Sequence, residues 1–275
     1  METGSFLLRN LSRTPWAIHP DKLCTIAEVI KHKIEDEKLV KLTQANSAGR
    51  KVDPIKGYET IGTKAIIPIY GTMMQRCSWL DAASGFVSMG ALEDAIKAAR
   101  ADNTIRHIIL DWDCPGGTVS GTEQLSNLVM ETRQYKRITS LINSEMCSGA
   151  LWVGTAADEV YSTAQANVVG SLGVYIAHTE YKNDKVKVTY IKAGKYKAAG
   201  NPYEPLAEDA LEQFQHLVDN DYDLFIDAVA RNRGTDADFV LDNWADAQLF
   251  HAFEAVENGL IDGIVSLDQL LAEED

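Results

Sequence analysis

The sequence predicts an α/β fold built on a mainly parallel sheet. From Lys64 onward, short apolar runs rich in β-branched residues alternate with segments of helical periodicity, a pattern typical of repeated βαβ units. The 275 residues are enough for one large domain, and the 45% hydrophobic and 24% charged shares match globular averages. This composition excludes disordered, collagen-like and coiled-coil chains.

The elements follow from the position of each run. The expected strands are Ala65–Tyr70, His107–Asp111, Ile138–Asn143, Glu159–Ser162, Val168–Val174 and Val186–Lys192. The expected helices are Met89–Ala101, Thr118–Tyr135, Ser148–Ala157 and Ala207–Arg231. In the last helix, apolar residues recur every three or four positions and predict a buried stripe. Its members are Leu211, Phe214, Val218, Tyr222, Phe225 and Val229.

Residues 1–60 differ from the rest and are predicted to form an N-terminal extension. A helix is expected over Lys22–Leu42, followed by a polar linker over Gln44–Lys56. The remaining residues, 61–275, are then the main domain.

Charge and cysteine usage narrow the function. The net charge of -14, with no Lys or Arg after Arg233, argues against a nucleic-acid partner. The apolar runs are too short for a membrane span, and no secretory signal is found at the start. The four cysteines are scattered without zinc spacing, so no metal or cofactor is indicated. A cytoplasmic protein is expected.

The first candidate motif is Asp113–Thr118, between a predicted strand and a predicted helix. Its consecutive glycines, Gly116 and Gly117, would leave backbone N–H groups open to a ligand. The Gly-Lys-Ser/Thr ending of a phosphate-binding loop is missing. Taken alone, such a sequence is more often a simple tight turn.

The second motif, Met146–Ala150, occupies the equivalent place one unit later. Right-handed crossovers bring the carboxyl ends of neighbouring parallel strands to one edge, so Ser148 should face the Gly116–Gly117 turn. A serine attacking a carbonyl there would have the Gly117 and Gly149 amides to stabilise the oxyanion. The alternatives are that Ser148 only caps a helix, or that Cys147 is the nucleophile.

A serine nucleophile needs a base, and the residues leave two kinds open. His178 follows a predicted strand and is the one credible imidazole, since His107 and His216 are expected to be structural. The other kind is a lysine that burial keeps neutral. The candidates are Lys192, Lys195 and Lys197.

Taken together, these motifs resemble signal peptide peptidase A and its relatives. The likeness lies in Cys147–Ala150, Ala156–Asp158 and Gly170–Val174, with the Asp113–Gly117 loop and Lys197 in the expected order around them. The closer resemblance is to the capsid-assembly (prohead) proteases of tailed phages. It includes Pro15–Pro20, Cys147 directly before the serine, and Lys197 three residues before Gly200–Tyr203. It extends over about residues 12–265.

The resemblance implies a Clp-protease/crotonase-like fold with repeated ββα units, and the activity of a serine endopeptidase. By position, it implies Ser148 as the nucleophile, Lys197 as the general base, and Ser171 as the group that orients the lysine amine. Gly117 and Gly149 would supply the oxyanion amides. No cofactor is implied.

The implied partners are polypeptide substrates, phage capsid or scaffold proteins among them, in the host cytoplasm or the prohead. A ring-like homo-oligomer is also implied, and in some members adjacent protomers share each active site. The N-terminal membrane anchor of cellular relatives and the scaffold-like C-terminal region of some phage relatives are not found in this sequence.

Three other functions are compatible with the residues. A bacterial peptidase could use the same machinery to degrade cleaved signal peptides. A crotonase-like acyl-CoA enzyme would use the two amides without a covalent serine, although no basic pocket for the CoA phosphates is evident. A proteolytically silent scaffold component is the third.

Overall fold

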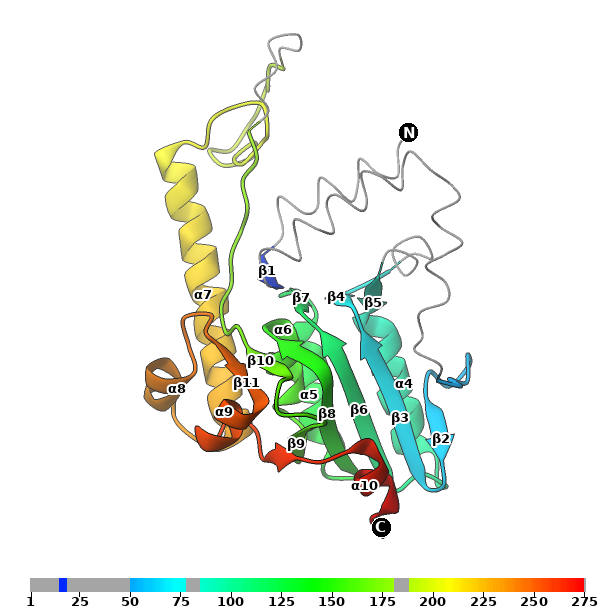
Figure 1. The fold of residues 1–275 in the computed structure, drawn as a ribbon. Helices are drawn as coiled ribbons and strands as arrows, with labels where there is room; N and C mark the ends of the chain where they lie inside the picture. The colour runs from blue at the N-terminus through cyan, green and yellow to red at the C-terminus, as the bar shows by residue number, and fades with distance from the viewer. Residues whose placement is uncertain (1–14, 19–49, 78–84, 181–187, 275) are drawn as a thin grey trace.

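The structure is a computed structural model that describes residues 15–18, 50–77, 85–180 and 188–274. Helices lie against a large sheet, and one long helix projects beyond it (Figure 1). The strands are β1 (Trp16–Ile18), β2 (Glu59–Ile61), β3 (Lys64–Tyr70), β4 (Thr72–Met74), β5 (Phe86–Ser88), β6 (His107–Cys114), β7 (Gly116–Thr118), β8 (Arg137–Cys147), β9 (Glu159–Ser162), β10 (Val168–Gly170), β11 (Leu249–His251) and β12 (Gly263–Ile264). The helices are α4 (Met89–Ala101), α5 (Thr122–Thr132), α6 (Gly149–Gly154), α7 (Glu208–Arg233), α8 (Ala237–Asn243), α9 (Ala252–Glu257) and α10 (Leu267–Ala272).

The main sheet has the strand order β11-β10-β8-β6-β3-β2. Its central strands β3, β6 and β8 run parallel. The long strand β8 pairs with β9 along its first half and with β10 at its end, again in parallel. Strands β2 and β11 end the order and run antiparallel to their neighbours. The prediction of a mainly parallel sheet is therefore confirmed.

A second, smaller sheet has the order β1-β7-β4-β5. Strand β4 follows β3 and precedes β5 and α4, while β7 follows β6 and precedes α5. Each unit thus contributes a long strand to the main sheet, a short strand to the second sheet, and a helix. This is the repeated ββα arrangement expected of the Clp-protease/crotonase-like fold, and that expectation is confirmed.

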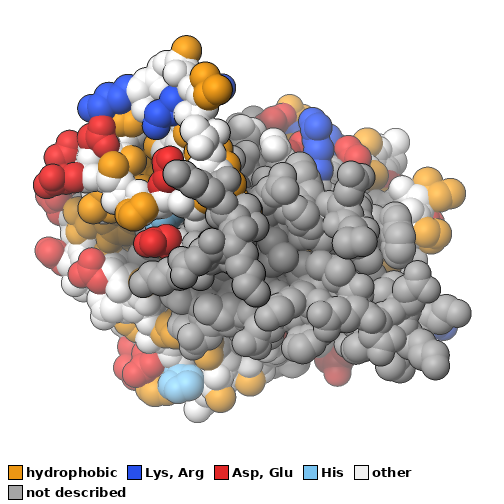
Figure 2. All heavy atoms as spheres, turned by 90° about the horizontal axis from the view of Figure 1, so that it is seen from above, with side chains coloured by type: hydrophobic (Ala, Val, Ile, Leu, Met, Phe, Trp, Pro, Cys, Tyr) orange, Lys and Arg blue, Asp and Glu red, His pale blue; other side chains and the backbone are white. Residues whose placement is uncertain are grey.

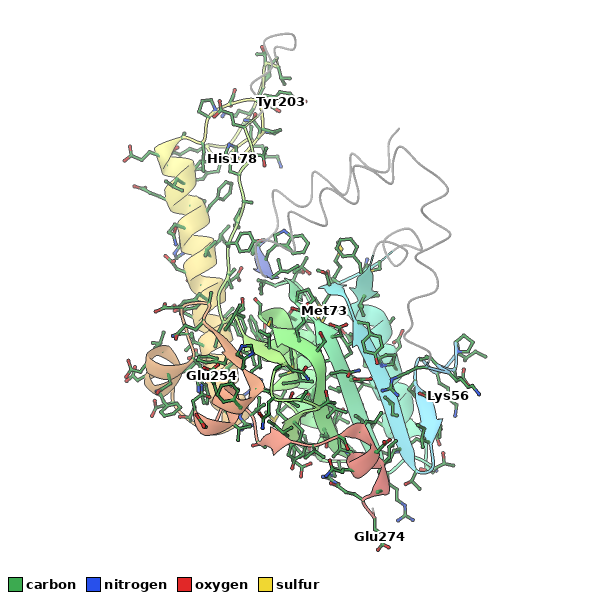
Figure 3. All side chains as sticks on the ribbon, viewed as in Figure 1. Lys56, Met73, His178, Tyr203, Glu254 and Glu274 are labelled. Carbon is green, nitrogen blue, oxygen red and sulfur yellow. The ribbon has the colours of Figure 1, made fainter. Side chains whose placement is uncertain are left out.

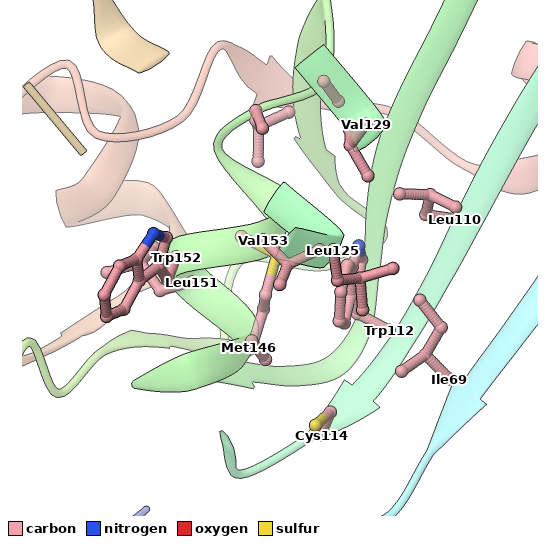
Figure 4. Packing of buried hydrophobic residues seen from close by; sticks show 14 of the residues in the cluster. Ile69, Leu110, Trp112, Cys114, Leu125, Val129, Met146, Leu151, Trp152 and Val153 are labelled. Atoms are coloured by element: carbon pink, nitrogen blue, oxygen red, sulfur yellow. The ribbon is translucent and has the colours of Figure 1, made fainter. Parts of the chain in front are cut away.

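The core lies between the main sheet and helices α4 to α6. Figure 4 shows Trp112 from β6 among side chains of α5 and α6, and Trp112 is fully buried. Its Nε1 donates to Ser140 Oγ at 3.0 Å, and Ser140 Oγ donates to the Gly154 carbonyl at 2.8 Å. On the opposite face, Leu270 of α10 packs against Ile66. Because both faces are covered, the central strands appear in the sequence as continuous apolar runs.

The predicted elements mostly have the expected positions. Helix Met89–Ala101 and strand Glu159–Ser162 have the predicted bounds, while β6 and β8 continue further, to Cys114 and Cys147. The predicted strand Val186–Lys192 is wrong over residues 188–192, which pair with no other strand among the described residues. Ile191 there is fully exposed, and a β-branched run without a neighbouring strand has no ladder to join.

Two predictions concern the N-terminal extension. The predicted helix Lys22–Leu42 lies outside the described residues. So do residues 44–49 of the predicted linker. The domain boundary near residue 60 stays a prediction.

Residues 173–180 and 188–207, together with the first half of α7, form an arm that projects from the body (Figure 1). The predicted buried stripe of α7 is correct for Phe225 and Val229, which are buried. It is wrong for Leu211, which is 53% exposed, and Phe214 and Val218 are only partly buried. These side chains are not buried because the first half of α7 extends past the sheet, where the body cannot cover it.

A buried ion pair fastens the segment before β2 to the sheet. Arg50 contacts Asp111 of β6, with Nη2 2.6 Å and Nε 2.8 Å from Oδ2. Tyr70 of β3 also donates its hydroxyl to Asp111, and burial raises the pKa of Tyr70 to about 12. Asp111 is completely buried, so its charge depends on these partners.

We expect Arg50→Met to lower the free energy of unfolding by about 3–5 kcal/mol, because it leaves the Asp111 carboxylate buried without its cation. Urea unfolding followed by circular dichroism measures the change. The control is Lys97→Met, which removes an exposed i,i+4 pair with Glu93 and should cost about 0.5 kcal/mol or less. Equal losses in the two variants would contradict this account.

Candidate active site

The ends of β6 and β8 bring the two glycine-containing motifs together, as the sequence predicts. An ideal Cβ on Gly116 would lie 3.0 Å from the Ser148 Cβ. One on Gly149 would lie 3.3 Å from the Gly117 amide nitrogen. Because Gly116 also has a φ of +114°, a residue with a side chain would be both strained and obstructed there. The close approach of the two turns therefore requires glycine.

Ser148 forms the sharp turn between β8 and α6. It is 1% exposed and has φ 54° and ψ -119°, a conformation that costs a residue with a side chain about 1–3 kcal/mol. Its backbone N–H donates to the Gly170 carbonyl at 2.8 Å, which ties the turn to β10. It occupies the N-cap position of α6, but its side chain makes no capping hydrogen bond. Instead, Oγ donates to the Gly173 carbonyl at 3.4 Å.

The amide groups of Gly117 and Gly149 lie beside this serine. Gly149 is the first residue of α6, so its N–H has no acceptor within the helix. An ideal Cβ on Gly149 would lie 3.3 Å from the Gly117 nitrogen, so the two glycines are close neighbours beside Ser148. Two backbone N–H groups next to a hydroxyl can stabilise an oxyanion during acyl transfer when both point at it.

Ser171 lies next to this turn, on the residue after β10. It has φ 56°, is 5% exposed, and donates its backbone N–H to the Gln248 carbonyl at 2.6 Å. Since Gly170 is paired with Cys147, Ser171 is adjacent to Ser148 in the sheet register. The structure therefore brings together Ser148, Gly117, Gly149 and Ser171.

The proposed bases do not join this group within one chain. Lys197 lies in the exposed turn region 193–200 of the arm, and its side chain contacts neither Ser148 nor Ser171 through any hydrogen bond among the described residues. Figure 3 places Tyr203 and His178 at the outer end of the arm, far from Met73, the β4 partner of Gly117. Lys195 forms an exposed ion pair with Asp209 at 3.0 Å.

Two buried thiols lie near the site. Cys147 is 2% exposed, and its Sγ lies 3.9 Å from the Val168 carbonyl, on the β10 side of the turn. Burial raises the pKa of the Cys114 thiol, which keeps it protonated.

One neighbour of the site is not predicted from the sequence. The segment Pro15–Pro20 carries no strand prediction, yet β1 pairs with β7 beside Gly117. The signal was present as a short apolar run, Trp16–Ile18, between two prolines.

Residues 131–275 match the model of peptidase family S49. The chain belongs to this family. Its sequence is 30% identical to the "Capsid assembly protease C" of Escherichia phage lambda over 215 residues, which are 77% of this chain and 48% of that protein. It is 27% identical to the "Head-tail preconnector protein GP5" of Enterobacteria phage P21 over 223 residues, or 80% of this chain and 44% of that protein.

A cellular S49 relative is similar to a comparable degree. The "Putative signal peptide peptidase SppA" of Enterococcus faecium is 27% identical over 177 residues, which are 62% of this chain and 50% of that protein. The chain thus spans about half the length of these relatives. Among solved structures, a ClpP1 mutant from Listeria monocytogenes has a TM-score of 0.47 and 11% identity, with 74% of this chain and 94% of that chain covered. The resemblance inferred from the motifs is confirmed.

No helix in the described part of the chain has the length and apolar character needed to cross a membrane.

We expect Ser148→Gly to be more stable than Ser148→Ala by about 1 kcal/mol, because glycine alone adopts this φ without a Cβ penalty. Ser148→Ala itself should stay within about 0.5 kcal/mol of the parent, since the lost hydroxyl made one long hydrogen bond. Urea unfolding of the two variants and the parent measures both differences. An alanine variant as stable as the glycine variant would show that the turn is unstrained.

Proposed function

We propose that this S49 protein is a serine endopeptidase in which Ser148 is the nucleophile and Lys197 the general base. The observation that carries the proposal is the convergence of the strained, buried Ser148 with the amides of Gly117 and Gly149. A hydroxyl held at a sharp turn between a strand and a helix, beside two inward N–H groups, suits attack on a carbonyl.

The reaction follows from these roles. The Ser148 Oγ attacks the carbonyl carbon of the scissile peptide bond as the Lys197 amine takes its proton. The negative oxygen of the tetrahedral intermediate accepts hydrogen bonds from Gly117 and Gly149, each worth about 3 kcal/mol in the transition state. The lysine then returns the proton to the leaving amine, and water hydrolyses the acyl-enzyme. Ser171 is proposed to orient the lysine amine when it reaches the site.

The lysine is proposed to come from a neighbouring copy of the chain. Lys197 is exposed on the arm, whereas Ser148 is buried in the body. The first part of α7 also carries exposed apolar side chains, Leu211, Leu217 and Leu224, which a second copy could cover. Figure 2, which looks down on the molecule from the side of the arm's end, displays basic side chains among hydrophobic ones at its upper left, with acidic side chains directly below them. A homo-oligomer would bring the arm of one protomer to the body of the next.

The proposed substrates are capsid or scaffold proteins of a phage prohead, with the host cytoplasm or the prohead as the setting. The similarity to a phage "Capsid assembly protease C" supports this choice. Degradation of cleaved signal peptides is the second candidate, and it is favoured by the similarity to a putative signal peptide peptidase. Membership of a peptidase family favours both over an acyl-CoA enzyme. Incubation with purified scaffold protein and with a synthetic signal peptide, followed by mass spectrometry, separates them.

Ser148→Ala is expected to abolish peptide hydrolysis, because it removes the nucleophile while leaving the turn intact. A fluorogenic casein assay measures the loss. Cys147→Ala is the matched control, a neighbouring buried residue whose truncation should leave most activity. Loss of activity in the cysteine variant together with an active Ser148→Ala protein would identify the thiol as the nucleophile. Hydrolysis of casein by the parent protein would exclude the alternative of a silent scaffold component.

Ser148→Ala and Lys197→Ala are each expected to be inactive alone and to recover partial activity when mixed under subunit exchange. A mixed interface joins one intact serine to one intact lysine, which a self-contained site cannot do. Light scattering verifies that the mixed proteins are oligomers, and the casein assay measures recovery. An oligomer that exchanges subunits without recovery would contradict the shared site. Full activity of a monomer would contradict the oligomer as well.

A further inference from the structure

Strand β1 lies against the candidate active site and is held along both of its edges. On one edge it pairs antiparallel with β7, with Ala17 opposite Gly117, and the Val119 N–H donates to the Pro15 carbonyl at 3.2 Å. On the other edge, the Trp16 N–H donates to the Tyr175 carbonyl at 2.9 Å, and the Tyr175 N–H donates to the Trp16 carbonyl at 3.0 Å. Residues 15–18 therefore fill a groove between β7 and the segment around Tyr175.

The register directs one carbonyl of β1 at the oxyanion position. In antiparallel pairs, hydrogen-bonded and non-hydrogen-bonded positions alternate. Pro15 and Val119 are a hydrogen-bonded pair, so the next hydrogen-bonded pair, two residues along each strand, is Ala17 and Gly117. The Gly117 N–H therefore faces the Ala17 carbonyl. An ideal Cβ on Gly149 would lie 3.3 Å from the Gly117 nitrogen and 3.4 Å from the Ala17 oxygen. The Ala17 carbonyl oxygen thus lies beside Gly116 and Gly149, next to the turn that holds Ser148.

The groove also selects side chains. Ala17 is completely buried, and its Cβ would lie 3.7 Å from a Cβ on Gly149, so a small residue fits at this position. Trp16 is 1% exposed, so the neighbouring position accepts a large aromatic side chain. Extended peptides commonly bind proteins by adding a strand to a sheet edge, with main-chain hydrogen bonds giving affinity and side-chain pockets giving specificity.

We propose that residues 15–18 are an internal substrate mimic, bound in the groove that receives an extended polypeptide with a small residue whose carbonyl enters the oxyanion position. The proposal rests on the proposed function and adds the groove, its occupant and its side-chain preference. The occupant keeps the site latent, since the Ala17 carbonyl lies beside Gly116 and Gly149, and Ser148 next to them is 1% exposed. A tethered segment competes at an effective concentration on the order of millimolar, so dilute substrates are excluded until β1 leaves.

The first test loosens β1 in the full-length protein. Trp16→Pro removes the N–H that Tyr175 accepts and the buried indole, and Trp16→Ala is a milder second variant. Each should raise kcat/KM for casein by about tenfold or more, because a larger fraction of molecules has an open groove. The control is Tyr135→Ala, which removes an exposed aromatic side chain of the body and should leave kcat/KM unchanged. Circular dichroism verifies the folding of each variant. If the parent protein hydrolyses casein, unchanged or lower activity in both folded Trp16 variants would overturn the proposal.

The second test measures binding and needs no turnover. A fluorescein-labelled peptide with the sequence of residues 12–21 is titrated into Ser148→Ala and into Ser148→Ala combined with Trp16→Pro or Trp16→Ala. Fluorescence anisotropy should give a Kd about tenfold or more tighter for the combined variants. The same peptide with Ala17→Phe should bind none of these proteins, because its phenyl ring would clash with Gly149. Equal Kd values for all proteins, or equal binding of the two peptides, would overturn the proposal.

The two tests distinguish this proposal from the proposed function. If no variant hydrolyses casein but the peptide binds the Trp16 variants more tightly, the proposal of a serine peptidase is wrong. The proposal that β1 occupies the groove is then still supported. If casein is hydrolysed but the peptide binds all the proteins equally, the serine peptidase is supported and the proposal of a substrate mimic is wrong. Cleavage between Ala17 and Ile18 that depends on Ser148 would support the mimic, since it requires the same register.

Discussion

The close approach of two backbone turns is the constraint on which the candidate site depends. The β6–β7 turn and the β8–α6 turn meet where a Cβ on Gly116 would lie 3.0 Å from that of Ser148. This contact requires parallel strands whose ends are in register, with Cys114 of β6 paired with Met146 of β8. It also requires glycine at the meeting point and a serine held at φ 54°. The positive φ of Ser148 is maintained because the surrounding strands β8 and β10 fix both sides of the turn.

The buried layer beneath the site gives this turn its rigidity. Trp152 of α6 stacks on Phe225 of α7, with ring centroids 4.8 Å apart. Asn232 of α7 donates its Nδ2 to the Trp152 carbonyl and to Thr155 Oγ1, each at 3.1 Å. The helix that follows Ser148 is thus fastened to the base of the arm. Any motion of α7 relative to the sheet would act directly on the helix that begins with Gly149.

The body and the arm have different physical roles. The body is a fully covered sheet with the proposed nucleophile Ser148, the two glycine amides and Ser171, whereas the arm carries Lys197 in solvent. Among the described residues of a single chain, no proposed base therefore makes a hydrogen bond with Ser148, whose Oγ donates to the Gly173 carbonyl. Strand β1 occupies the groove beside it. Under the proposals made above, assembly supplies the base and the departure of β1 opens the groove. Both steps would keep a peptidase inactive until it meets its partners.

The sequence by itself determined the α/β class, most strands and helices, and the meeting of Gly116 and Gly117 with Ser148. These follow from local patterns, because apolar runs mark the strands and crossover handedness brings their ends to one edge. Only the tertiary structure decided that residues 188–192 form no strand, that Leu211 is exposed, and that Trp16–Ile18 lies beside the site. The physical reason is that each of these depends on which distant segment is available to pack or pair. A periodic pattern predicts an apolar face, but long-range contacts alone determine what covers it.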